Sequence, residues 1–261
     1  MKRTLIVTCL LAALSAHLSA ELKYTVHMDL KKAEGPGAQS TNPIVAMVGD
    51  GLLKQMVPEG GADLLYTIGD KGVRVEFQQA ALGQPAGTVS LSLLDGTMIV
   101  MSPKDKTYWK ANADSIITAM RSSTAPVAVA KPSAEFSTVA GMKCEVVAFS
   151  WKMDLPIPPS ARASLPPDFP KSLDITGDMC LMKEPFERYA EIAGKSKVPD
   201  VLAYMGLDTI TKGSIVLRQN IRLGAHELQA VVTKIGEEEA QAGSFDLPTD
   251  YKEVPSPVGR R

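Results

Sequence analysis

Alternation of hydrophobic and polar residues with a period of two is the dominant pattern in this chain. Between residues 22 and 31, the even positions hold Leu, Tyr, Val, Met and Leu, and the odd positions hold Lys, Thr, His, Asp and Lys. Successive side chains of a strand point to opposite faces of a sheet. The segment is therefore predicted to be a strand with one face in the core and the other in water.

Similar runs separated by turn residues predict a series of β-hairpins. The sequence Asp95-Gly96 lies between two apolar runs, which is among the strongest short signals for a hairpin turn. Further strands are predicted at residues 64–68, 73–78, 89–94, 97–101, 107–110, 143–153 and 173–182. The segment from Ser122 to Ser133, rich in Ser, Ala and Pro, is interpreted as a connection.

The clearest hairpin lies near the end of the chain, where strands 215–223 and 227–235 flank Gly224-Ala225. Leu217 and Ile221 are expected to face the core, and Arg218 and Arg222 are expected to face water. A shift of one residue in register would expose every apolar side chain, so the register should be well specified.

Short helices interrupt the strands. They are predicted at residues 42–55, 112–121, 185–193 and 199–205, and Gly194 and Gly206 stand where the last two should end. Consecutive hairpins with a few short helices indicate an α+β fold, in which a strongly curved antiparallel sheet carries helices against one face. We expect one domain over residues 21–254 and a flexible C-terminal tail over residues 255–261.

The first twenty residues have the parts of a cleavable signal peptide. Lys2 and Arg3 precede an apolar stretch from Thr4 to Leu14, and small residues end at Ala20. The alternative, a buried first helix, does not explain two adjacent charges before an uninterrupted apolar run. Cys9 lies too early for a lipid-anchored lipoprotein. We expect cleavage after Ala20 and a periplasmic protein, with an extracellular location as the alternative.

Charge and cysteine content fit this compartment. Without Lys2 and Arg3, 26 basic residues face 29 acidic ones, a net charge near −3 that is too small and too mixed to suggest nucleic acid as a partner. No later segment is long and apolar enough to span a membrane. Cys144 and Cys180 then form an even pair, which is a candidate disulfide in an oxidising compartment. Two buried free thiols are the alternative.

Four short motifs occur in the order found in a family of exported bacterial proteins known as a domain of unknown function. They are Gly72-Val73-Arg74-Val75-Glu76, Thr97-Met98-Ile99-Val100 followed by Asp105-Lys106-Thr107-Tyr108, residues 139–146, and residues 245–252. The chain resembles this family over most of its length. Two departures are a longer, proline-rich loop between the Cys144 and Cys180 strands, and Cys180 itself, which replaces a more usual aromatic residue.

The resemblance implies a fold like that of the periplasmic lipoprotein-localisation factors LolA and LolB. In that fold an antiparallel sheet curls into an open half-barrel, and helices cover its concave face. The resemblance supplies no catalytic residues, and a fold by itself does not determine function.

The sequence offers little for catalysis or for metal binding. After the signal peptide only His27 and His226 remain, neither in a metal-binding motif, and Cys144 and Cys180 lack the spacing of a zinc site. There is no G-x-S-x-G or S-x-x-K nucleophile motif and no phosphate-binding glycine loop. We therefore expect no enzyme activity, no cofactor and no metal.

Methionine is the most suggestive residue type that remains. Its flexible thioether side chain adapts to irregular apolar guests, as an acyl-chain pocket requires. The alternative is that these residues are ordinary core. The candidates for lining an apolar ligand are Met28, Met98, Met101, Met120 and Met205.

These observations favour a non-enzymatic periplasmic binding protein for a lipid, a lipoprotein or another apolar ligand, held in the half-barrel. The alternative is an envelope module for protein–protein interaction or stress sensing, which uses the same fold without a small-molecule ligand. The two hypotheses differ in whether the concave face is hollow or filled by side chains.

Overall fold

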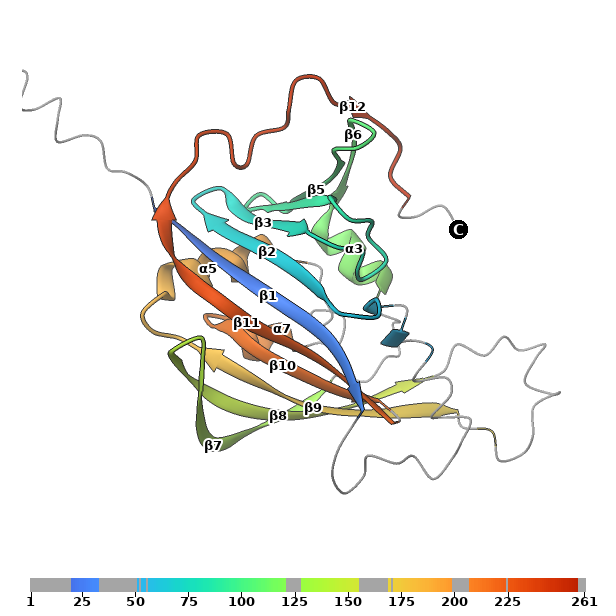
Figure 1. Ribbon diagram of the computed structural model, residues 1–261, viewed down its shortest axis with the longest axis vertical. Helices are drawn as coiled ribbons and strands as arrows, with labels where there is room; N and C mark the ends of the chain where they lie inside the picture. The colour runs from blue at the N-terminus through green and yellow to red at the C-terminus, as the bar shows by residue number, and fades with distance from the viewer. Residues whose placement is uncertain are drawn as a thin grey trace, which may run out of the picture.

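Most of the expected strands form a single twelve-stranded sheet in the computed structural model (Figure 1). The structure describes residues 20–32, 51, 53–54, 56–120, 128–154, 169, 171–198, 207–223 and 225–257. The strands are β1 (Ala20–Lys32), β2 (Ala62–Gly69), β3 (Gly72–Phe77), β4 (Val89–Leu93), β5 (Thr97–Ser102), β6 (Thr107–Asn112), β7 (Val129–Val139), β8 (Met142–Asp154), β9 (Ser172–Met182), β10 (Ile215–Leu223), β11 (His226–Glu239) and β12 (Lys252–Glu253). The helices in the described part of the chain include α3 (Ala113–Met120), α5 (Glu187–Ser196) and α7 (Asp208–Thr211).

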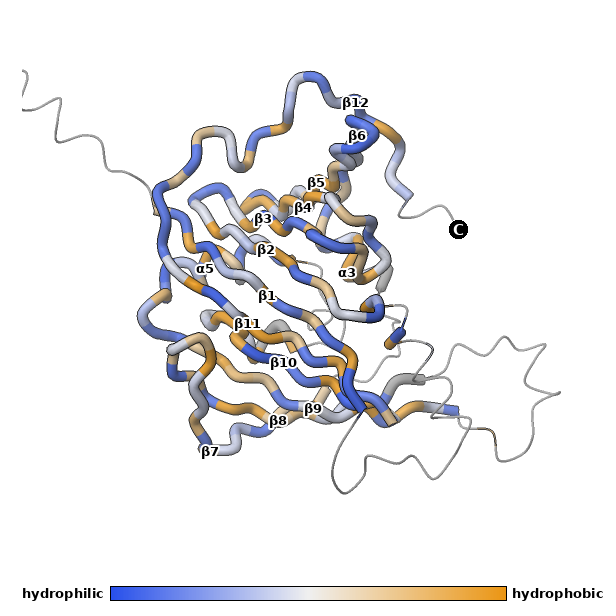
Figure 2. The backbone as a smooth tube through the Cα atoms, in the orientation of Figure 1, coloured by the Kyte–Doolittle hydropathy of each residue, from blue (hydrophilic) through white to orange (hydrophobic). Residues whose placement is uncertain are grey.

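The strand order is β12-β6-β5-β4-β3-β2-β1-β11-β10-β9-β8-β7. Every pairing is antiparallel except that of β12 with β6. The first strand therefore lies in the middle of the sheet, between β2 and β11. Hydrophobic and hydrophilic residues alternate along many of the strands (Figure 2), which confirms that the period-two pattern indicates strands.

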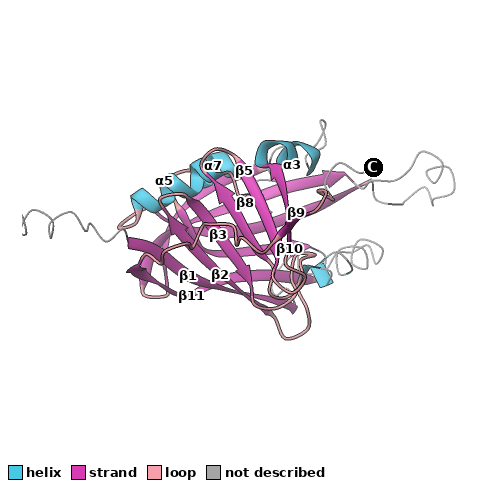
Figure 3. Ribbon diagram, turned by 90° about the horizontal axis from the view of Figure 1, so that it is seen from above, coloured by secondary structure: helices cyan, strands magenta, loops and turns pink. Residues whose placement is uncertain are grey.

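The sheet is strongly curved, and the three helices lie in a row along its concave side (Figure 3). We call the sheet face toward these helices the inner face. Most of the main core belongs to it, with Leu22, Leu64, Ile68, Leu217 and Val232 among its buried side chains. The α+β prediction of a curved antiparallel sheet with a few short helices is confirmed at this level.

The C-terminal segment covers part of the outer face. Phe245 packs there with Leu91, Ile99 and Met101, in a second buried cluster that β4, β5 and β6 provide. Arg74 donates a hydrogen bond of 2.8 Å to the backbone carbonyl of Ser244. Residues of β3, β4 and β5 thus contact the C-terminal segment on the outer face, and this segment buries apolar side chains that would otherwise be exposed.

Ion pairs hold the same segment along the edge of the sheet. Lys106 pairs with Asp250 at 2.8 Å, and the hydroxyl of Tyr108 lies 2.9 Å from a carboxylate oxygen of Glu253. Backbone bonds from Lys252 to Lys106 and from Val254 to Tyr108 complete the parallel pairing of β12 with β6. Several residues of the family-like motifs therefore contact one another around this segment.

Two local predictions were wrong. Strand β7 occupies part of the segment that was interpreted as a connection, and Pro132 fits there because β7 is an edge strand with one side unpaired. Helix α5 runs through Gly194 to Ser196 and ends at Lys197, which has a left-handed conformation (φ 48°). The helix predicted at residues 112–121 is confirmed as α3, and Asn112 caps it by accepting a hydrogen bond from the Ser115 amide.

Some predictions concern residues outside the described ranges. Residues 1–19 of the signal peptide and most of the helix expected from residue 42 fall there, as do the helix at residues 199–205 and residues 258–261 of the tail. Ala20 is the first residue of β1, and its carbonyl accepts a hydrogen bond of 3.2 Å from the hydroxyl of Tyr189. The signal peptide stays a prediction.

Tyr189 gives a test of how α5 packs onto the sheet. It is buried, with 3% of its surface exposed. Burial, together with a hydrogen bond and the charge of Glu237, raises the pKa of Tyr189 to about 12. An unfolded tyrosine ionises near pH 10, so the folded protein holds this proton more tightly between about pH 10 and pH 12, and its stability should fall as the pH rises through this range.

We expect this loss to amount to roughly 2–3 kcal/mol for Tyr189 alone. Tyr189→Phe should reduce the decline, because phenylalanine has no phenol to ionise. Urea unfolding of both proteins from about pH 9 to pH 12 would measure it. Parallel declines in the two proteins would show that Tyr189 is not held neutral by the fold.

Candidate functional site

A cavity of about 620 Å³ lies between the inner face and the helices. Strands β1, β2, β3, β10 and β11 form its wall on the sheet side, and α3, α5 and α7 contribute the opposite side. The wall residues from the strands are Tyr24, Val26, Met28, Leu64, Tyr66, Val73, Ile215, Val216, Leu217, Gln219, Ile221, Leu228 and Ala230. The described side chains therefore do not completely fill the space between the inner face and the helices.

The register of the sheet explains why these residues gather here. Met28 pairs with Ala230 across β1 and β11, and Ala230 pairs with Gln219 across β11 and β10. Paired residues in neighbouring strands point to the same face, so one inward row crosses three strands. Ile221 and Leu228 form the next inward row. These rows bring together distant segments of the chain. Met28 and Gln219, which both pair with Ala230, are about 190 positions apart in the sequence.

The sheet side of the cavity is mostly aliphatic, with one aromatic pair. The rings of Tyr24 and Tyr66 stack with their centroids 4.8 Å apart and their planes 7° from parallel. These residues occupy paired positions on β1 and β2. The stack presents a flat apolar surface to the cavity, as is common in sites for apolar ligands.

The helix side is more polar. Asp114 at the start of α3 and Lys197 just beyond α5 both line the cavity, and the Lys197 ammonium contacts both carboxylate oxygens of Asp114, at 2.9 and 2.7 Å. Lys212, directly after α7, also lines the cavity and lies close to Gly194, since a Cβ added there would be 4.0 Å from the Cγ of Lys212. The ion pair joins α3 to α5 across the top of the cavity.

Two buried polar atoms in the wall have no hydrogen-bond partner in the part of the chain that the structure describes. They are the Oγ of Ser214 and the Nε2 of Gln219, which both belong to residues that line the cavity. A buried polar group without a partner is unfavourable, so such groups usually bind water or a ligand. Ser214 is almost completely buried, with 7% of its surface exposed.

The five candidate methionines do not form one group. Met28 is buried and lines the cavity. Met98 lies on the inner face, because it pairs with Ser92 and through it with Val73, but it is not among the lining residues. Met101 packs in the outer cluster with Phe245, which corrects its assignment as a lining residue. The side chain of Met120 and all of Met205 lie outside the described part of the chain.

The candidate disulfide is confirmed: Cys144 of β8 and Cys180 of β9 are bonded. Both residues are buried. The bond joins two neighbouring strands near one edge of the sheet, and neither cysteine is among the residues that line the cavity. A buried disulfide of this kind is typical of proteins from oxidising compartments.

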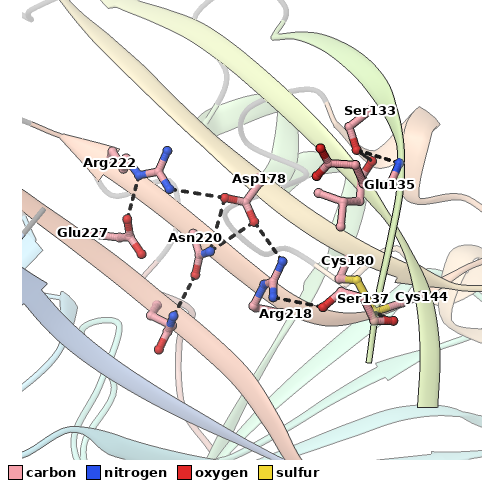
Figure 4. A network of polar contacts seen from close by, with 12 residues as sticks. Ser133, Glu135, Ser137, Cys144, Asp178, Cys180, Arg218, Asn220, Arg222 and Glu227 are labelled. Atoms are coloured by element: carbon pink, nitrogen blue, oxygen red, sulfur yellow. Dashed lines mark hydrogen bonds and ion pairs between the residues drawn. A yellow bond between two sulfur atoms is a disulfide. The ribbon is translucent and has the colours of Figure 1, made fainter. Parts of the chain in front are cut away.

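A polar network lies on the outer face beside the disulfide (Figure 4). Asp178 accepts hydrogen bonds from Asn220 at 3.1 and 3.2 Å, and the guanidinium groups of Arg218 and Arg222 approach it to 3.4 and 3.5 Å. Arg218 also contacts the hydroxyl of Ser137 on β7. Leu217 and Ile221 are buried as expected, whereas Arg218 is only 25% exposed and is bound into this network, not free in water.

A second hollow of about 540 Å³ lies on the outer face beside the C-terminal segment. Charged side chains of both signs line it, including Lys23, Arg74, Glu76, Lys234 and Glu238. Arg74 and Glu76 pair with each other at 2.9 Å, and Lys23 pairs with Glu238 at 3.3 Å. This hollow is therefore an exposed polar groove whose charges largely compensate one another.

Residues that could bind a metal are scattered. Within the described ranges, no group of three or more His, Cys, Asp or Glu side chains has the geometry of a metal site. His27 pairs with Asp63 at 2.8 Å. None of the described helices is long and apolar enough to cross a membrane.

Sequence reasoning missed most of the cavity wall. The alternation in β1, β10 and β11 identifies Tyr24, Gln219 and Ala230 as members of one face of their strands, but not which strands are neighbours. The contribution of Lys197 and Lys212 had no sequence signal, since it depends on how the helices lie over the sheet.

No protein-family model and no curated protein sequence matches the chain. One solved structure with similarity is a domain from Vibrio parahaemolyticus described as an outer membrane lipoprotein-sorting protein domain. The structural alignment covers 93% of this chain and 95% of the Vibrio domain, with 8% sequence identity and a TM-score of 0.32. Values this low do not establish a common fold or a common function.

Proposed function

We propose that this protein is a non-enzymatic binding protein of the bacterial periplasm, which holds an acyl chain of a lipid or lipoprotein between its curved sheet and its helices. The observation that carries the proposal is the cavity of about 620 Å³ beneath α3, α5 and α7. Its volume lies in the range of ordinary ligand sites, about 300–1,000 Å³. The disulfide supports an oxidising compartment.

The chemistry of the wall favours a hydrocarbon guest. Met28, Leu64, Leu217, Ile221 and Leu228 are all buried and all line the cavity. Burial of hydrocarbon contributes about 0.8 kcal/mol per methylene group, so a long chain in such a cavity would gain enough free energy for stable binding. The proposal requires no reacting set of side chains.

Filling the cavity should abolish binding. Ala230 lines the wall on β11, so Ala230→Trp would place an indole ring in the space that the chain occupies. We expect uptake of a fluorescent fatty-acid analogue to weaken about tenfold or more, as the buried contacts of several methylene groups are lost. Titration of the probe into the purified protein would measure this.

Ala148→Trp is the matched control. Ala148 is exposed, and it pairs with Asp178 on the outer face. It should leave probe binding unchanged. Equal binding by the unaltered protein and both variants would show that the probe does not enter the cavity, and the proposal would then be wrong.

The second candidate function is a protein–protein interaction module. Its support is edge strand β7, on which Val129 and Phe136 are 58% and 63% exposed. An exposed edge strand can pair with a strand of a partner. This function needs no cavity, so probe binding that depends on Ala230 favours the acyl-binding proposal.

A further inference from the structure

The cavity extends along strand β10. Residues 214–217, 219 and 221 all line it, and they lie in or directly before β10. Ile221 lies seven positions after Ser214, which corresponds to about 23 Å at the rise of a β-strand. A guest that follows β10 would therefore have its two ends in different surroundings.

One end is polar and positively charged. Lys212, Ser214 and Lys197 all line the cavity near the helices. The charge of Lys197 is compensated by Asp114, at 2.7 Å. Lys212 forms no ion pair with a described carboxylate, and Ser214, two positions later, has a buried hydroxyl without a hydrogen-bond partner among the described residues.

The other end is apolar. Ile221 pairs with Leu228 there, and Met28 lies in the neighbouring row. All three side chains are buried. A charged group at this end would lose its hydration without gaining a partner, which is strongly unfavourable.

We infer that the cavity binds an anionic single-chain amphiphile in a fixed direction, with the oxyanion at Lys212 and Ser214 and the chain running along β10 toward Ile221. This inference rests on the proposed function and adds the head-group chemistry and the orientation. A carboxylate and a phosphate share the required chemistry, since both are oxyanions that accept hydrogen bonds from an ammonium and a hydroxyl group. A fatty acid and a monoacyl phosphate lipid are thus the two sources to compare.

The test compares a fatty acid with its methyl ester of the same chain length, using displacement of a fluorescent probe. The ester keeps the chain and loses the charge. For the unaltered protein we expect tighter binding of the acid. Lys212→Gln and Ser214→Ala should each weaken acid binding about three- to tenfold and leave ester binding unchanged, as expected for one charge-assisted contact at a partly exposed site.

Lys195→Gln is the matched control, because Lys195 is an exposed lysine of α5 that pairs with Glu191 and does not line the cavity. It should change neither affinity. Titration of the same variants with a monoacyl phosphate lipid distinguishes the fatty acid from the phosphate lipid. The ligand with the preferred head group should show the larger loss of affinity when Lys212 is replaced by glutamine.

The amide of Gln219, which has no hydrogen-bond partner among the described residues, allows a test of the opposite orientation of the ligand. Gln219 lies about 16 Å from Ser214 along β10, beside the expected chain and not beside the head group. Gln219→Leu should therefore bind both acid and ester at least as tightly as the unaltered protein. If it weakens acid binding while Lys212→Gln has no effect, the head group lies at Gln219 and the inference is wrong.

Failure of this inference can be distinguished from failure of the proposed function. Equal affinity for acid and ester, unchanged by the Lys212 and Ser214 variants, would overturn the inference and leave acyl binding intact. Binding of neither compound would overturn both.

Discussion

Replacing Leu217 by aspartate is expected to prevent folding. Leu217 has no exposed surface and lies in the main core while also lining the cavity. A carboxylate at this position would be buried without a partner, which costs several kcal/mol, and the apolar contacts of leucine would be lost as well. Since the total stability of a domain is about 5–15 kcal/mol, most of it would be lost. Circular dichroism and urea unfolding would measure the effect.

The milder Leu217→Ala should cost about 2–5 kcal/mol and still permit folding. Leu94 offers the matched control, since it is 42% exposed near the turn between β4 and β5. Leu94→Asp should change stability by less than about 0.5 kcal/mol. If the Leu217 and Leu94 aspartate variants were equally stable, the assignment of Leu217 to the inner face would be wrong.

Removing the disulfide should destabilise the protein by roughly 3–4 kcal/mol. The bond between Cys144 and Cys180 closes a loop with a sequence separation of 36 residues, and the cross-link lowers the conformational entropy of the unfolded chain. We expect the double variant Cys144→Ala, Cys180→Ala to unfold at a correspondingly lower urea concentration. The slope of the unfolding transition also changes if the unfolded chain becomes more expanded.

The oxidation state itself is measured by intact mass after alkylation without a reductant. The protein from an oxidising compartment should take up no alkyl group, because both cysteines described in the structure are bonded to each other. Two alkylated thiols would contradict the bond. Equal unfolding midpoints for the oxidised protein and the double variant would instead show that the bond is present but contributes no stability.

The strands with one buried and one solvated face could be predicted from the sequence. In β1, β10 and β11 the two faces differ in polarity, so alternation identifies both the strand and its inward side. Strand β7 was missed because it is an edge strand in which most side chains are exposed and Pro132 interrupts the pattern. Its place is determined by pairing with β8, which local sequence does not show.

Met101 shows a second limit of the pattern. Strand β5 has buried residues on both faces, because the C-terminal segment with Phe245 covers the outer one. Alternation cannot tell which buried face is the inner one in such a strand. The assignment of Met101 to the cavity failed for this reason, whereas Met28 lies in a strand with a more polar outer face.

The end of α5 and the polar end of the cavity depend on long-range contacts. Gly194 was expected to end the helix, but the helix continues past it, and Lys212 lies close to this glycine. The ion pair of Asp114 with Lys197 joins residues that are 83 positions apart. Neither contact has a local signature, so the helix side of the site could not be predicted from the sequence.

Native mass spectrometry of the protein, purified without detergent from the periplasm of a bacterium that expresses the full chain, tests acyl binding most directly. If the cavity holds an acyl chain, the protein should show an additional mass that solvent extraction removes and lipid analysis identifies as an acyl compound, and Ala230→Trp should lack it. A single mass without ligand, together with no uptake of fatty acid or its ester by the purified protein, would show that the cavity does not bind acyl chains.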